Sequence, residues 1–287
     1  MKSFKRAVIL VIAALLLVVL PVSAITGNWV KDYDHPFVAM ITFFDAKGDF
    51  VWRCSGSLID ATHLVTAGHC ADTAGGAASA FAYFQQDAGV NYNPDTQKDP
   101  VTGYPDSCAG DTLGNTCATS HQIFNYGFND FAGFPDTHDV GLLILDQPII
   151  LTEYADLPKA GILDNYANAR GTKDPVFTVS GYGLSYSVQE HSALSNLSYR
   201  ERLMANSTLI NLKSRNTDGF NLQTQGNGDG RGGTCSGDSG GPVFLGNSSS
   251  NLMVAVTSFG MNDICRGTDY SYRLDRPEVL SWIESLE

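Results

Sequence analysis

The chain has 287 residues, of which 43% are hydrophobic and 17% charged, proportions that fit one or two compact domains and exclude a long disordered polypeptide. Thirty acidic residues against eighteen basic ones give a net charge of -12, with no lysine- or arginine-rich block. This balance argues against a nucleic-acid partner.

The first 24 residues have the pattern of a secretory signal peptide. Basic residues up to Arg6 precede an apolar run, Ala7 to Leu20, and small residues follow as far as Ala24. The run is shorter than the ~20 residues of a spanning helix, so an uncleaved membrane anchor is the less favoured alternative. We expect cleavage after Ala24, no stable membrane anchor, and a secreted mature protein that is extracellular or periplasmic.

Beyond residue 24, short segments rich in Val, Ile, Phe and Thr alternate with turns, and 29 glycines punctuate the chain. This pattern predicts an all-β fold, a sandwich or a barrel. The expected strands are 37–44, 51–59, 63–67, 140–145, 176–182, 203–212, 242–245, 252–259 and 270–274. Only the C-terminus predicts a helix, because Pro277 suits a first turn and four apolar residues then share one face: Val279, Leu280, Ile283 and Leu286.

Two stretches have weak apolar periodicity and predict loops. Residues 71–136 are rich in Gly, Asn, Asp, Pro and Ala, and they are too poor in apolar residues to bury the core of a separate small domain. Residues 215–233 are rich in glycine and lead directly to the segment that contains Ser239.

All the cysteines follow residue 24, and an even number in an exported chain favours disulfides. Their six positions allow fifteen pairings: Cys54, Cys70, Cys108, Cys117, Cys235 and Cys265. A zinc site is the less favoured interpretation, since there is no CxxC pair and the His69-Cys70 doublet has no matching second half. We expect no metal.

The segment from Gly237 to Pro242, Gly-Asp-Ser-Gly-Gly-Pro, places Ser239 between glycines. Such a loop can turn tightly and present two N–H groups beside an exposed hydroxyl, as a nucleophile with an oxyanion hole requires. A serine nucleophile also needs a base and an orienting carboxylate. His69 ends an apolar strand in TAGHC, and Asp139 directly precedes the apolar run VGLLIL.

The motifs TAGHC, DVGLLIL and GDSGGP, in the order His, Asp, Ser, resemble those of the chymotrypsin/trypsin family of serine endopeptidases, and the resemblance spans residues 25–283. It implies two antiparallel Greek-key β-barrels with a C-terminal α-helix. Residues 25–150 would form the first barrel with a long loop insertion, and 151–287 the second barrel and the helix. The cysteine-light pattern resembles microbial, secreted members.

The resemblance also implies roles for individual residues. His69 would be the general base, Asp139 its orienting carboxylate and Ser239 the nucleophile. The N–H groups of Gly237 and Ser239 would form the oxyanion hole. Two family bridges match Cys54–Cys70 and Cys235–Cys265, which leaves Cys108–Cys117 as the third. Ser258-Phe259-Gly260 resembles the family strand that pairs with an extended peptide substrate. No cofactor is implied.

The residue six before the nucleophile, which selects Lys or Arg when it is aspartate, is Gly233 here, and Thr234 beside it is neutral. We therefore expect an uncharged P1 preference. One alternative stays open: Asp269 or Tyr270 could face the pocket, because a shift of one residue on a strand exchanges the inward side chain. Asp269 would make basic residues acceptable, and Tyr270 would make the pocket shallow.

The family's processed amino terminus folds inward and pairs with the aspartate before the nucleophile. Signal cleavage would here leave Ile25 as the first residue, so its α-amine is expected to pair with Asp238. The expected protein is a monomeric serine endopeptidase that acts on polypeptides and that a protein inhibitor could bind. The alternatives are a non-catalytic binding module on the same fold and an unrelated esterase, which the order His69, Asp139, Ser239 disfavours.

Overall fold

The computed structural model describes residues 25–93, 95–98, 103–105, 107–108, 111, 114–166, 175–184, 200–226, 231–262 and 265–287. The expected signal peptide, residues 1–24, lies outside the described residues. Among the described residues, no helix is both long and apolar enough to cross a membrane.

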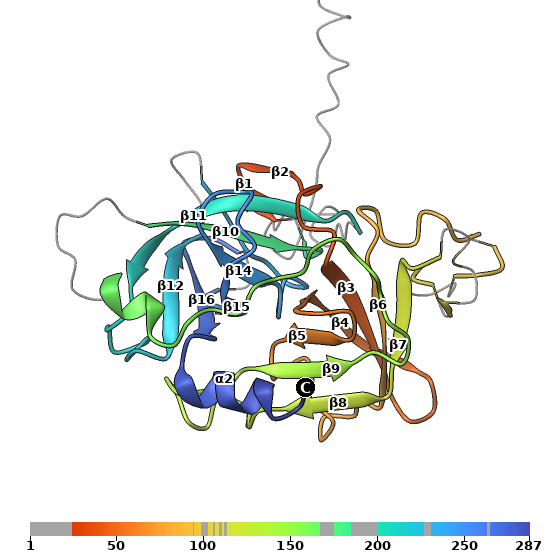
Figure 1. The fold of residues 1–287 in the computed structure, drawn as a ribbon, viewed down its shortest axis with the longest axis horizontal. Coiled ribbons are helices and arrows are strands. Elements are labelled where there is room, and N and C mark those ends of the chain that lie inside the picture. The colour runs from red at the N-terminus through yellow and green to blue at the C-terminus, as the bar shows by residue number, and fades with distance from the viewer. Residues whose placement is uncertain are drawn as a thin grey trace, which may run out of the picture.

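The first barrel is a seven-stranded antiparallel sheet in the order β7-β6-β3-β4-β5-β9-β8 (Figure 1). Its centre is the long pair β3 and β4, in register from Val38 opposite Ser57 to Phe43 opposite Trp52, after which an irregularity places Phe44 opposite Phe50. The strands are β3 (Val38–Phe44), β4 (Phe50–Leu58), β5 (His63–Thr66), β6 (Ser79–Tyr83), β7 (Cys117–Ser120), β8 (Gln122–Asn125) and β9 (Gly141–Ile144).

The second barrel has the strand order β10-β14-β15-β16-β12-β11, and it closes because β11 also pairs with β10. Its strands are β10 (Val176–Gly181), β11 (Leu203–Asn211), β12 (Asn221–Gln225), β14 (Pro242–Leu245), β15 (Met253–Gly260) and β16 (Thr268–Arg273). A short 3-10 helix, η2 (Ile162–Tyr166), precedes it along the chain. Closure leaves few unpaired strand edges in this half of the molecule.

Each end of the described chain packs on the opposite barrel. Near the N-terminus, β1 (Thr26–Gly27) pairs with β13 (Gly232–Gly233) and β2 (Trp29–Lys31) pairs with β11, both in the second half of the chain. The C-terminal helix α2 (Pro277–Glu284) lies beside β8 and β9 of the first barrel (Figure 1). These exchanges join the two barrels into one body.

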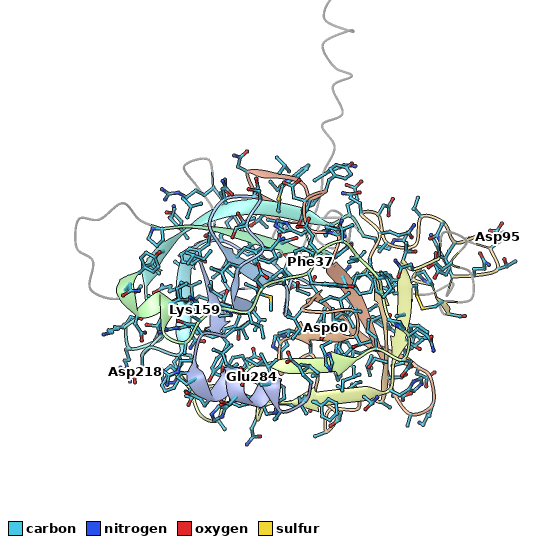
Figure 2. All side chains as sticks on the ribbon, viewed as in Figure 1. Phe37, Asp60, Asp95, Lys159, Asp218 and Glu284 are labelled. Atoms are coloured by element: carbon cyan, nitrogen blue, oxygen red, sulfur yellow. A yellow bond between two sulfur atoms is a disulfide. The ribbon has the colours of Figure 1, made fainter. Side chains whose placement is uncertain are left out.

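The interface between the barrels is built from aromatic and buried polar side chains. Phe37, labelled near the centre of Figure 2, packs edge-to-face on Phe244 of β14 with ring centroids 6.0 Å apart. Arg202, 3% exposed, donates to the carbonyl oxygens of Asp32, Val38 and Phe84. Because a buried guanidinium needs several acceptors, these bonds fix the barrels against each other.

The structure confirms the all-β, two-barrel fold with a C-terminal helix, and it confirms the three disulfides Cys54–Cys70, Cys108–Cys117 and Cys235–Cys265. The prediction of loops throughout 71–136 and 215–233 was wrong, because β6, β7, β8, β12 and β13 lie there. Small and polar residues fill the buried positions of these strands, for example Ala80 and Ala82 in β6 and Thr224 in β12. Such residues carry little hydrophobic signal, and pairing with neighbouring strands supplies the stability.

Candidate active site

His69 and Asp139 meet because their strands pair. His69 lies in the turn after β5, Asp139 lies just before β9, and β5 and β9 are antiparallel with Thr66 opposite Gly141. The backbone N–H of His69 donates to Oδ1 of Asp139 at 2.8 Å, and its Nδ1 lies 2.9 Å from Oδ2. Two contacts to one carboxylate fix both the position and the rotation of the imidazole.

Asp139 is held as a carboxylate in a fully buried position. Burial alone would raise its pKa, but the charge and hydrogen bond of His69 and the hydroxyl of Ser258, which donates to Oδ2, lower the pKa below its usual value. Burial would likewise lower the pKa of His69, and Asp139 outweighs it, so the pKa lies above 6.5. A ring held this way accepts a proton at Nε2 readily.

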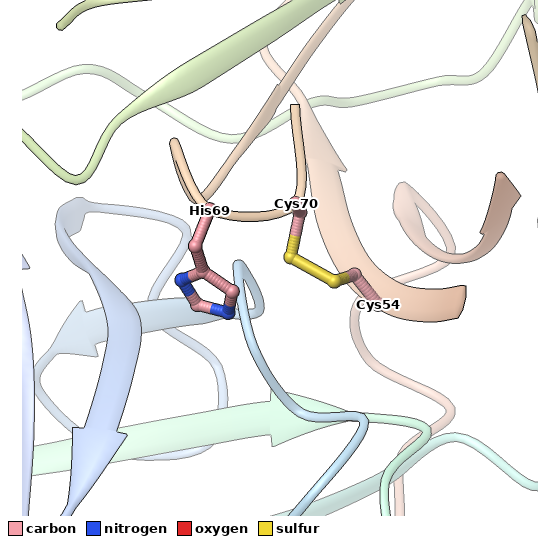
Figure 3. Close-up of side chains that lie close together, drawn as sticks. All are labelled: Cys54, His69 and Cys70. Atoms are coloured by element: carbon pink, nitrogen blue, oxygen red, sulfur yellow. A yellow bond between two sulfur atoms is a disulfide. The ribbon is translucent and has the colours of Figure 1, made fainter. Parts of the chain in front are cut away.

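The Cys54–Cys70 disulfide fastens the turn that carries His69 to strand β4 (Figure 3). The carbonyl oxygen of Ser239 lies 3.7 Å from the Cys70 sulfur, which places the Ser239 loop beside this turn. Within the described part of the chain, the Ser239 hydroxyl has no hydrogen bond to the His69 ring. Cys54, His69 and Cys70 cluster closely, but both sulfurs are in the disulfide and offer no thiolate to a metal.

In the loop before β14, the two peptides that carry the N–H groups of Gly237 and Ser239 are each fixed by a hydrogen bond on the carbonyl. The carbonyl of Ser236 accepts the N–H of Leu184, and that of Asp238 accepts the N–H of Gly241, both at 2.8 Å. In a planar trans peptide the following N–H points the opposite way, so the N–H groups of Gly237 and Ser239 face away from these bonds. Neither N–H has an acceptor among the described residues, which leaves both able to hold an oxyanion.

A cavity of about 180 Å³ opens beside Ser239, and its lining includes the predicted binding residues Thr234, Ser258, Phe259, Gly260 and Asp269. Gly233 precedes this lining, and a Cβ on it would lie 2.5 Å from Oδ2 of Asp269. The strand 258–260 extends past the last residue of β15 that pairs with β14, Val256, so one edge has no strand partner among the described residues.

Asp269, not Tyr270, faces the cavity. The Asp269 carboxylate accepts the N–H of Thr234 at 2.8 Å, is 6% exposed, and lies directly against Gly226, where a Cβ would come within 2.9 Å. Burial raises the pKa of Asp269 to about 6. Tyr270 instead stacks on Phe259 with ring centroids 4.7 Å apart. The cavity therefore contains a carboxylate, in contrast to the uncharged pocket expected from Gly233 and Thr234.

An aromatic cluster that the sequence reasoning missed borders the cavity. Phe128 lies against His69, with ring centroids 5.8 Å apart, and against Phe131. Phe131 and Phe134 both pack on Phe259 and remain 38% and 44% exposed. The spacing of Phe128, Phe131 and Phe134 near the end of the predicted loop 71–136 was the available signal, since exposed aromatic residues in loops often mark binding surfaces.

The structure does not join Ile25 and Asp238. Ile25 is fully buried in the core of the second barrel, and its nitrogen is in the peptide bond to Ala24. The buried Asp238 carboxylate accepts the N–H groups of Gly183 at 2.7 Å and Cys235 at 2.9 Å, and no ion pair reaches it from any described residue. Burial raises the pKa of Asp238 to about 7.

Comparisons with known proteins identify the family and several relatives. The family model described as Trypsin matches residues 24–283. Serine protease 7 of Drosophila melanogaster is 29% identical over 244 residues, and CLIP domain-containing serine protease B10 of Anopheles gambiae is 29% identical over 138 residues. These matches cover 82% and 45% of this chain, and 57% and 34% of the relatives, so the chain spans less than two thirds of either relative's length.

Solved structures share the fold. HL collagenase matches with a TM-score of 0.61 at 22% identity, over 91% of this chain and 97% of that one. Human heparin binding protein matches with a TM-score of 0.58 at 21% identity, over 90% and 95%. At this identity the likeness concerns the fold alone. The family match covers nearly all the residues that carry the two barrels and the site between them, and the chain belongs to the trypsin family.

Proposed function

We propose that the protein is a serine endopeptidase that cleaves polypeptides through an acyl-enzyme intermediate. The observation that carries this proposal is the buried Asp139 carboxylate, which orients His69 beside a loop with two unengaged N–H groups at Gly237 and Ser239. Membership of the trypsin family supports the same reaction class.

In the proposed reaction, Ser239 Oγ attacks the carbonyl carbon of the scissile peptide while His69 Nε2 takes its proton. The N–H groups of Gly237 and Ser239 bind the resulting oxyanion, and Asp139 stabilises the imidazolium. The C–N bond then breaks, and the leaving amine takes the proton from His69. In the second half of the reaction, water gives a proton to His69 and adds to the acyl carbon. The ester bond to Ser239 then breaks, and His69 returns the proton to the Ser239 oxygen.

We further propose that the P1 residue is lysine or arginine. Among the described residues, one carboxylate, Asp269, lines the cavity beside Ser239, and Arg266 lines it as well. A long cationic P1 side chain would pair with the Asp269 carboxylate there. This departs from the uncharged preference expected from Gly233. The carboxylate comes instead from β16, where Asp269 approaches glycine backbone too closely for any side chain at Gly233.

The proposed binding mode adds the substrate as an extended strand to residues 258–260, whose backbone has a free edge. Apolar substrate side chains would then contact the exposed rings of Phe131 and Phe134. A protein inhibitor that presents an extended loop would use the same edge.

We also propose secretion after cleavage at Ala24, followed by pairing of the Ile25 α-amine with Asp238. The raised pKa of the buried Asp238 carboxylate supports the second step, because a nearby cation would stabilise the ionised form. Mature protein beginning at Ile25 should be more active than protein with one extra N-terminal residue. Equal activity of the two forms would contradict the pairing.

The test of the function is mass-spectrometric mapping of cleavage sites in a diverse peptide library, with protein beginning at Ile25. Cuts after Lys and Arg that disappear in Ser239→Ala are the expected result. Cuts after uncharged residues would overturn the role of Asp269 but not the reaction. Folded protein that makes no Ser239-dependent cuts would favour a non-catalytic binding module.

A further inference from the structure

A side chain from the first barrel reaches the loop that carries Ser239. Ser55 follows Cys54 on β4 and is fully buried. Its hydroxyl donates to the carbonyl oxygen of Gly237 at 2.9 Å and accepts the N–H of Tyr182 at 3.0 Å. Its own N–H donates to the carbonyl oxygen of Ser239 at 2.8 Å. One residue of the first barrel thus binds both ends of the oxyanion loop.

The hydroxyl of Ser55 fixes the peptide between the two oxyanion groups. The peptides that end in the N–H of Gly237 and of Ser239 are each held by a backbone hydrogen bond on their carbonyl. The peptide between them joins Gly237 to Asp238. Its N–H donates to the carbonyl oxygen of Cys235 at 2.9 Å, and Ser55 donates to its carbonyl oxygen from the first barrel. Rotation of this peptide would turn the two N–H groups relative to each other. Gly237, at φ +95°, has no Cβ to oppose such rotation, so the hydrogen bonds of Ser55 and Cys235 are what oppose it.

We propose that Ser55 is a positioning residue for the reaction, whose hydroxyl holds the Gly237–Asp238 peptide so that both oxyanion N–H groups converge. The proposal rests on the proposed endopeptidase function. It does not depend on a free N-terminal amine, because the bonds of Ser55 are present while Ile25 is still in peptide linkage.

The same strand offers a matched control. Ser57 lies two residues further along β4, on the same face, and is also fully buried. Its hydroxyl has no hydrogen-bond partner among the residues that the structure describes. Ser57→Ala therefore removes the same atom from the same strand without breaking a bond to the oxyanion loop.

The experiment compares Ser55→Ala and Ser57→Ala with the wild type, all beginning at Ile25. It measures kcat and KM on one peptide, the inhibition constant of a peptide aldehyde, and Tm. We expect Ser55→Ala to lower kcat about 10-fold and to weaken aldehyde binding by a similar factor, with KM nearly unchanged, because the loss falls on oxyanion binding. Ser57→Ala should keep the wild-type values. Ser55→Gly, which also lacks the hydroxyl, replaces Ser55→Ala if that variant does not fold.

Wild-type kcat and aldehyde affinity in Ser55→Ala would overturn the proposal. So would an equal loss in both variants, which would indicate general damage to the core. A wild-type protein without Ser239-dependent cleavage would instead overturn the proposed function. In that case crystal structures of wild type and Ser55→Ala decide the positioning role, and an unmoved Gly237 carbonyl would overturn it.

Discussion

At the scale of single residues, the environment of a carboxylate decides its chemistry. Asp139 and Asp269 are both buried, yet the pKa of Asp139 lies below its usual value and that of Asp269 rises to about 6. The difference comes from their partners. Asp139 accepts three hydrogen bonds and faces His69, whereas Asp269 is bonded by the N–H and the side chain of Thr234 and has no cation as a described hydrogen-bond partner. The first is suited to orient a base, and the second to pair with an incoming cation.

Asp139→Asn should lower kcat about 10⁴-fold, because an amide no longer holds His69 in the tautomer that accepts a proton at Nε2. In the wild type, activity should fall as the pH decreases through the raised pKa of His69, with a midpoint above 6.5. Measuring kcat and kcat/KM of the wild type and of Asp139→Asn from pH 5 to 9 checks the loss in the variant and the pH dependence of the wild type. The control is Asp146→Asn, which removes the carboxylate of an exposed pair with His121 and should leave activity unchanged.

Asp269→Asn should reduce kcat/KM for P1 lysine or arginine by about 10²-fold or more relative to P1 leucine, since it removes the charge that pairs with the cation. In the wild type, Asp269 loses its proton as the pH rises through about 6, so the preference for a basic P1 residue should be greater at pH 8 than at pH 5. The ratio of the two substrates cancels the titration of His69. A ratio that is independent of pH and unchanged in Asp269→Asn would contradict this assignment.

At the scale of elements, apolar alternation predicted the strands that form the cores and missed those built from small or polar residues. In β12, Asn221–Gln225, the buried positions include Asn221 and Thr224, which hydropathy assigns to loops. Strand β12 lies between β11 and β16, and its pairing with both strands fixes its position. The C-terminal helix was predictable because Pro277 and the apolar face of α2 are local signals, while the barrel on which it packs is not encoded locally.

Ile283→Ala in α2 should lower the free energy of unfolding by about 2–5 kcal/mol, because Ile283 is fully buried against the first barrel and alanine leaves a cavity. Urea denaturation measures the change. Glu284→Ala, an exposed neighbour, should change stability little. Because α2 packs on the first barrel and contributes no residue to the candidate active site, kcat of folded Ile283→Ala should stay near that of the wild type.

At the scale of the whole molecule, the cleft depends on how the two barrels are held together. Arg202 binds acceptors in the N-terminal segment, in β3 and in the segment after β6, and Nη1 also donates to the hydroxyl of Tyr182. These segments are far apart in sequence and include both barrels. The charge of one buried residue thus contributes to the relative placement of His69 and Ser239.

Arg202→Met should destabilise the protein by about 3 kcal/mol, because it leaves the buried carbonyl oxygens of Asp32 and Phe84 without the guanidinium donor. Arg215→Met, at an exposed position, is the control and should have little effect. Urea unfolding followed by tryptophan fluorescence measures both. An Arg202→Met variant as stable as the wild type would show that the hydrogen bonds of Arg202 are not needed to hold the barrels together.

The sequence by itself determined the family motifs around His69, Asp139 and Ser239, the cysteines, the all-β class and the C-terminal helix. These features depend on residue identity and on patterns among residues close together in the chain, and both can be read directly from the amino-acid sequence. Tertiary structure decided that Asp269 rather than Tyr270 faces the cavity, that the Phe128–Phe134 segment borders it, and that Ser55 binds Gly237. Each of these depends on strand register and on contacts between residues far apart in sequence, which local patterns do not specify.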